Sequence, residues 1–164
     1  ADKLEYHLNQ KNCVAVGECG LDKLKGAELK RQIELFTLQL NLANKYNKPV
    51  IIHCVKAFNE LIILRKEYRD GIWISHGFRG KKDLALSLER NNIKLSFGTH
   101  LLRNTQVQEA FCALNLQNVF LETDEQASDE IYKLMEHAAA LKNVSLDAFK
   151  QILQNNINQT FNLV

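Results

Sequence analysis

Four separate apolar segments of this 164-residue chain each end in a residue that can bind a metal ion. Each segment has the length and composition of a buried strand. Two imidazoles and two carboxylates together form a ligand set that suits Zn²⁺, Mn²⁺ or a related divalent ion. The four segments and their closing residues are Ala15–Glu18, Val50–His53, Ile72–His76 and Val119–Asp124.

Each closing residue has a plainer interpretation when it is taken alone. A carboxylate after a strand often caps the next helix or pairs with a base, and a histidine often packs in a core. The four taken together favour a metal site, because charged groups are rarely buried without a partner. We therefore expect Glu18, His53, His76 and Asp124 to be metal ligands. Asp124 would also exchange a proton with the reacting water as general acid-base.

The stretches between these segments show helical periodicity, so strands and helices alternate along the chain. Such alternation predicts a parallel sheet with right-handed crossover helices, whose active sites lie at the carboxyl ends of the strands. The expected strands are Cys13–Val16 (from which Gly17–Asp22 leads off), Val50–His53 (opened by Pro49), Ile72–His76, Ile93–Phe97 and Val119–Glu122. The expected helices are Ala27–Tyr46, Phe58–Tyr68, Lys81–Asn91, Asn104–Leu114, Asp129–Leu141 and Ser145–Phe161, with Ser145 as an N-cap and Leu4–Gln10 as a helix end or connector.

Five strands are too few for a complete (β/α)₈ barrel, which typically needs about 200 residues or more. The pattern leaves two architectures open, an open doubly wound sheet or the later part of a barrel. The chain has neither a linker-like segment nor an internal repeat, so residues 1–164 are expected to form one domain.

The composition of the chain bears on its binding partners and on its cellular compartment. The formal net charge is +2, so no broad basic field predicts duplex binding, and contact with a phosphodiester would be local. No segment is long and apolar enough to span a membrane, and the N-terminus lacks a signal-peptide pattern. The four cysteines show no Cys-x-x-Cys spacing, which predicts reduced thiols and a cytoplasmic protein.

Several blocks in the same order resemble the TatD family of metal-dependent deoxyribonucleases, a branch of the amidohydrolase-like TIM barrels. The resemblance covers essentially the whole chain. The matching blocks are Gly17-Glu-Cys-Gly-Leu-Asp22, the helical spacing of Gln32, Phe36, Gln39 and Ala43, Pro49-Val-Ile-Ile-His53, Ser75-His-Gly-Phe-Arg-Gly80, Leu95-Ser-Phe-Gly98, Leu121-Glu-Thr-Asp124, and Asn156 with Phe161.

This resemblance implies a TIM-type (β/α)₈ barrel of which the chain supplies the later five strands. It implies that Glu18 bridges two metal ions, that His53 and His76 hold one of them, and that Asp124 is a ligand and the catalytic base. The cofactor would be one or two ions of Mg²⁺, Mn²⁺ or Zn²⁺, and the substrate DNA or another phosphodiester. The family's first strand carries a His-x-His pair that these 164 residues lack, and Gln126 stands where a proline commonly follows the E-T-D block.

Weaker candidates lie beside these ligands. Arg79 and His100 are expected to contact the substrate, although His100 could equally be a solvated loop residue, and Lys56 could meet phosphate. Asp22 could orient a ligand or cap the helix that begins near Ala27. Two other functions stay open: a related barrel hydrolase acting on a lactone, amide or phosphotriester, and a relative without catalysis that binds partners through exposed sheet edges.

Overall fold

The computed structural model describes residues 2–124 and 130–163. The chain separates into two compact units, residues 1–75 and 76–164, which are described here one at a time. In both units parallel strands alternate with helices, so the α/β fold class is confirmed. None of the helices in the described ranges is long and apolar enough to cross a membrane. The four cysteines are free thiols.

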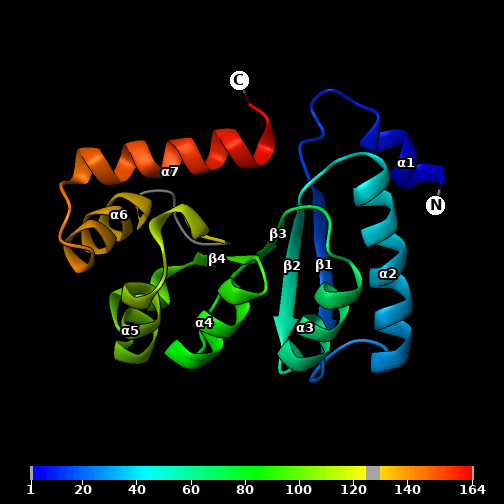
Figure 1. The fold of residues 1–164 in the computed structure, drawn as a ribbon, viewed down its shortest axis with the longest axis horizontal. Coiled ribbons are helices and arrows are strands. Elements are labelled where there is room, and N and C mark those ends of the chain that lie inside the picture. The colour runs from blue at the N-terminus through cyan, green and yellow to red at the C-terminus, as the bar shows by residue number, and fades with distance from the viewer. Residues whose placement is uncertain (1, 125–129, 164) are drawn as a thin grey trace. The chain divides into compact units, whose positions relative to one another are not determined.

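The first unit is a three-stranded parallel sheet in the order β1-β2-β3 with helices along it (Figure 1). Helix α2 buries Phe36 and Leu40, and the Phe36 ring meets Trp73 edge to face at 5.7 Å. This apolar contact joins the helix to the last strand of the unit. The elements are α1 (Asp2–Leu8), β1 (Val16–Asp22), α2 (Leu29–Lys45), β2 (Val50–Val55), α3 (Phe58–Glu67) and β3 (Trp73–Ser75).

The second unit carries two parallel strands, β4 (labelled in Figure 1) and β5, together with its helices. Four phenylalanines (Phe78, Phe97, Phe111 and Phe149) form a run of edge-to-face contacts, with ring centroids 5.2–6.4 Å apart, through its core. All four are fully buried, so this run stabilises the core of the second unit, including the end of β4 at Phe97. The elements are α4 (Lys82–Arg90), β4 (Ile93–Phe97), η1 (Thr99–Leu102), α5 (Thr105–Ala113), η2 (Leu116–Asn118), β5 (Val119–Leu121), α6 (Glu130–Leu141) and α7 (Leu146–Phe161).

The expected elements agree with the observed ones to within a few residues, with one exception. The first strand was placed at Cys13–Val16, whereas β1 begins at Val16 and continues to Asp22. Two glycines explain the difference, because a Cβ at Gly20 would lie 2.0 Å from the carbonyl oxygen of His53. The close approach lets the Gly17–Asp22 segment pair with β2 instead of leaving the sheet.

Helix ends follow simple capping rules. Ser145 caps α7 as expected, because its hydroxyl accepts a hydrogen bond of 3.2 Å from the amide of Ala148. Asparagines with positive φ follow α2, α4, α6 and α7, which suits the left-handed turn that commonly ends a helix. The expected start of the sixth helix at Asp129 and the substitution at Gln126 lie outside the described residues.

Candidate metal centre

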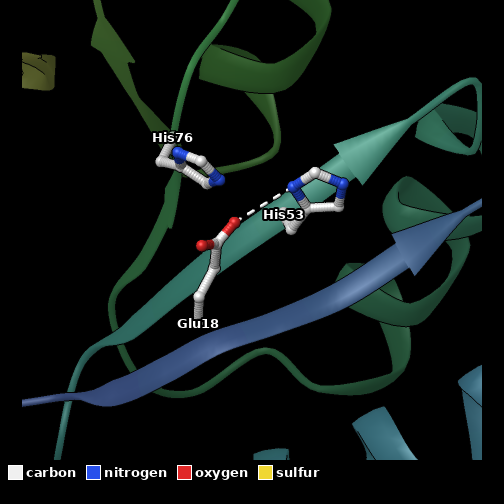
Figure 2. A group of neighbouring side chains, drawn as sticks. All are labelled: Glu18, His53 and His76. Carbon is white, nitrogen blue, oxygen red and sulfur yellow. Dashed lines mark hydrogen bonds and ion pairs between the residues drawn. The ribbon is translucent and has the colours of Figure 1, made fainter. Parts of the chain in front are cut away.

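Glu18 and His53 face each other across the first two strands. The register pairs Gly20 with His53, and a bulge between Val16 and Cys19 shifts the first part of β1. The Glu18 carboxylate lies 3.0 Å from Nδ1 of His53 (Figure 2). Both side chains are accessible, with 48% and 41% of their side-chain surfaces exposed. The pair is therefore open to a ligand from solvent.

These two residues lie within strands and not at strand ends, so that part of the sequence interpretation was wrong. Glu18 is the third residue of β1, and His53 is followed by two more residues of β2. Both strands are longer than expected, because their pairing continues to Asp22 and Val55.

His76 directly follows β3, and the β2–β3 register pairs Ile52 with Ser75. The next residue of each strand is a histidine, so the register brings His53 and His76 to the same level. One ligand atom from each of Glu18, His53 and His76 lies within 4.8 Å of the others (Figure 2). Three of the four expected ligands thus form a group whose spacing allows one metal ion.

Asp22 contacts the other nitrogen of the His53 ring. Its Oδ2 lies 3.3 Å from Nε2, and its Oδ1 accepts the backbone N–H groups of Leu24 at 2.7 Å and Lys25 at 3.1 Å. The Leu24 amide, followed by His53, holds the pKa of Asp22 below its usual value despite partial burial. The helix α2 instead has Glu28 at its N-cap position, so Asp22 serves the histidine and its own turn.

Glu122 plays a comparable part beside His76. Its Oε1 lies 3.5 Å from Nδ1 of His76, and its side chain is 20% exposed. Burial raises the pKa of Glu122, but hydrogen bonds from His76, the Ser96 hydroxyl and the Gly77 amide outweigh this and lower it overall. Glu122 therefore stays an anion at neutral pH, a role that the sequence interpretation, which chose only Asp124, had missed.

Asp124, Arg79 and His100 line one pocket of the second unit, whereas Lys56 belongs to the first unit and does not line it. This pocket has a volume of about 360 Å³ and is lined by residues from the ends of β4 and β5 and from the loop after His76. The pKa of His100 is lowered by partial burial and by the nearby charge of Arg79. The lining residues are Gly77, Phe78, Arg79, Gly98, Thr99, His100, Glu122, Thr123 and Asp124.

Asp124 has an unusual backbone for its residue type. Its φ angle is +52°, in the left-handed region, and it follows a strand, whereas four of the other described non-glycine residues with positive φ are asparagines after helices. Aspartate tolerates this conformation better than most residues, and such angles cluster at functional sites.

Comparison with known proteins decides the family. The profile of the family described as TatD related DNase matches residues 1–162. The chain belongs to this family. The resemblance expected from the sequence blocks is therefore confirmed.

Two Escherichia coli proteins resemble this TatD-family chain, one in sequence and one in structure. It is 29% identical over 171 residues to the "uncharacterized metal-dependent hydrolase YcfH" of Escherichia coli, an alignment covering 94% of this chain and 64% of that protein. Its structure matches the crystal structure of YjjV, a TatD homologue from Escherichia coli, with a TM-score of 0.87 and 27% identity, over 99% of this chain and 70% of that one. The chain spans about two thirds of the length of these relatives.

A third relative is more distant in origin. The "uncharacterized metal-dependent hydrolase MJ1582" of Methanocaldococcus jannaschii is 23% identical over 163 residues, covering 93% of this chain and 64% of that protein. Metal-dependent hydrolysis is thus the activity in the names of bacterial and archaeal relatives alike.

Proposed function

We propose that Glu18, His53 and His76 hold a divalent metal ion in a hydrolase that cleaves phosphodiester bonds, with DNA as its substrate class. The observation that carries the proposal is the grouping of these three side chains. Carboxylate and imidazole are the ligands that Zn²⁺ and Mn²⁺ accept together. The relatives named as metal-dependent hydrolases and the DNase family description support the same activity.

The hydrogen-bonding capacity of His53 supports a cation at this place. An ionised carboxylate only accepts hydrogen bonds, and a neutral imidazole has one N–H to donate. His53 has a carboxylate at each of its two ring nitrogens, Glu18 at Nδ1 and Asp22 at Nε2. One of these contacts therefore needs a second proton on the ring or a bound cation, and Glu18 together with Nδ1 of His53 would be the groups that hold such a cation.

Asp124 is the proposed general base and further ligand, on the strength of the matching E-T-D block. In the second unit it shares its pocket with Arg79, whose planar guanidinium suits the oxygens of a phosphate group. A bound divalent ion would supply charge neutralisation at phosphorus and a water molecule that is nucleophilic at neutral pH. Asp124 would accept the proton of that water, and Arg79 with His100 would orient the phosphodiester.

Metal binding and hydrolysis are tested separately. Calorimetric titration of the chain with Zn²⁺, Mn²⁺ and Mg²⁺ measures binding, and labelled single- and double-stranded DNA measures cleavage. We expect a tight divalent site, lost in Glu18→Gln, and a drop of at least about 100-fold in cleavage rate for Asp124→Asn. Asp83→Asn, an exposed carboxylate on α4, is the matched control and should change neither quantity.

Three results would overturn parts of this proposal. Absence of any tight divalent site would identify a relative without catalysis. Binding without cleavage of any phosphodiester, but with hydrolysis of a lactone, amide or phosphotriester, would reject the substrate class. Full activity in both Glu18→Gln and Asp124→Asn would show that the residues are assigned wrongly.

A further inference from the structure

Both histidines of the candidate metal centre are backed by a carboxylate, but through different ring nitrogens. Asp22 lies at Nε2 of His53, whereas Glu122 lies at Nδ1 of His76. A carboxylate accepts a hydrogen bond, so each one selects the tautomer that carries the proton on the nitrogen it faces. The opposite nitrogen of each ring then presents its lone pair.

The carboxylates of Asp22 and Glu122 are less exposed to solvent than that of Glu18. The side chain of Asp22 is 17% exposed and that of Glu122 is 20% exposed, against 48% for Glu18. A carboxylate removed from water needs its hydrogen bonds from protein donors, whereas an exposed one can be solvated. The proton of His53 therefore stabilises the contact with Asp22 more than the shorter contact with Glu18.

Other donors already hold each carboxylate in place. Asp22 accepts two backbone N–H groups through Oδ1, which leaves Oδ2 directed at His53. Gln32 fixes the backbone of Asp22, since its Oε1 accepts the Asp22 amide at 2.7 Å and its Nε2 donates to the Asp22 carbonyl at 2.8 Å. Glu122 is held by Ser96 and by the amide of Gly77.

We propose that Asp22 and Glu122 are positioning residues that fix opposite tautomers of the two histidine ligands. His53 carries its proton on Nε2 and offers Nδ1 to the metal, and His76 carries its proton on Nδ1 and offers Nε2. This inference rests on the proposed metal site. It adds that the two rings bind the ion through different nitrogens because two carboxylates, themselves not ligands, dictate it.

The tautomers can be read directly. Long-range ¹H–¹⁵N correlation spectra of the chain, metal-free at alkaline pH and loaded with Zn²⁺, distinguish Nδ1–H from Nε2–H for each ring. Calorimetry of Zn²⁺ binding accompanies them for Asp22→Asn, Asp22→Ala and Glu122→Gln. Asp83→Asn and Glu136→Gln, both exposed, are the matched controls, and thermal unfolding shows that each variant is folded.

Replacing the Asp22 carboxylate by an amide should weaken Zn²⁺ binding more than removing the side chain does. In Asp22→Asn the side-chain oxygen can still accept the Leu24 and Lys25 amides, but the NH₂ group donates toward Nε2 and drives the proton to Nδ1. We expect Zn²⁺ affinity to fall about 10- to 100-fold, with the His53 tautomer inverted, and Asp22→Ala to lose less. A purely structural role predicts the opposite order, because alanine also loses the turn.

The possible outcomes distinguish a failure of the positioning role from a failure of the proposed metal site. Zn²⁺ binding in the wild-type chain with unchanged affinity in Asp22→Asn and Glu122→Gln would overturn the positioning role and leave the metal site standing. The same tautomer in both rings would also overturn it. A wild-type chain that binds no Zn²⁺ would refute the proposed metal site, and the metal-free spectra would then decide the tautomers alone.

Discussion

Gln32 ties the turn after β1 to helix α2, and its removal should loosen that turn. The side chain accepts one hydrogen bond from the Asp22 amide and donates toward the carbonyls of Asp22, Lys25 and Ala27 at 2.6–3.1 Å. A typical net contribution is about 1 kcal/mol for a hydrogen bond in a partly buried place, and less for an exposed one. The NH₂ group has two hydrogens for these three carbonyls, so at most three hydrogen bonds form at once, two of them partly buried, and Gln32→Ala should cost about 2–3 kcal/mol.

Two measurements test this estimate. Urea unfolding gives the global free energy, and amide hydrogen exchange at Leu24 and Lys25 reports the turn itself, since both amides donate to Asp22. If opening of the turn limits exchange, a loss of 2–3 kcal/mol corresponds to about 30- to 150-fold faster exchange. The matched control is Gln106→Ala, which removes the same side-chain groups at an exposed position in the first turn of α5, away from this turn. Equal losses of stability in the two variants would refute the role assigned to the Gln32 hydrogen bonds.

Three further changes follow from named contacts. Asn156, 3% exposed, donates at 2.7 and 3.0 Å to two backbone carbonyls at η2 and β5, so Asn156→Ala should lower the free energy of unfolding by about 2–4 kcal/mol in urea titration. Ser145→Ala removes the N-cap of α7 and should cost about 1 kcal/mol by the same assay. A hydrogen bond from Lys23 lowers the pKa of Glu60 from 4.5, so the stability that Glu60→Gln removes should be present above pH 4.5 and vanish as the pH falls further.

Controls exist for each of these changes. Asn155→Ala, an exposed neighbour on α7, should cost far less than Asn156→Ala. Ser145→Asp keeps a capping oxygen and should restore most of the stability that alanine loses. For Glu60, the difference in melting temperature between the wild type and the glutamine variant is compared at neutral and acidic pH. A difference that grows on acidification would contradict the assigned ion pair.

The regular elements were predictable because local patterns and burial agree in them. The period of apolar residues placed α2 through Phe36, Leu40 and Ala43, all of which are buried. The fourth strand, Ile93–Phe97, matches its predicted bounds. The predicted bounds of the first strand were wrong because a glycine in a sequence usually indicates a turn. Gly17 and Gly20 instead permit a close approach of the backbone within the sheet.

The candidate ligands were predictable by residue type, and Asp22 was considered as a residue that orients a ligand, but Glu122 was not predicted. Glu122 lies two residues before Asp124, and both line one pocket, so the same E-T-D block carries two acidic side chains with different surroundings. Sequence alone gives no measure of burial or of donors in space. The contacts of Glu122 with His76 and Ser96 join residues 46 and 26 positions apart in the chain, and they become visible only in the folded unit.

The spacing of Glu18, Gly20 and Asp22 explains how one histidine comes to have two carboxylates. Gly20 is the register partner of His53, and the two acids stand two residues before and after it. In a strand, residues at i−2 and i+2 project to the same face. The acids therefore flank the ring, one at Nδ1 and one at Nε2. A side chain at position 20 would meet the His53 backbone, so the glycine is what lets β1 come close enough for both contacts to form.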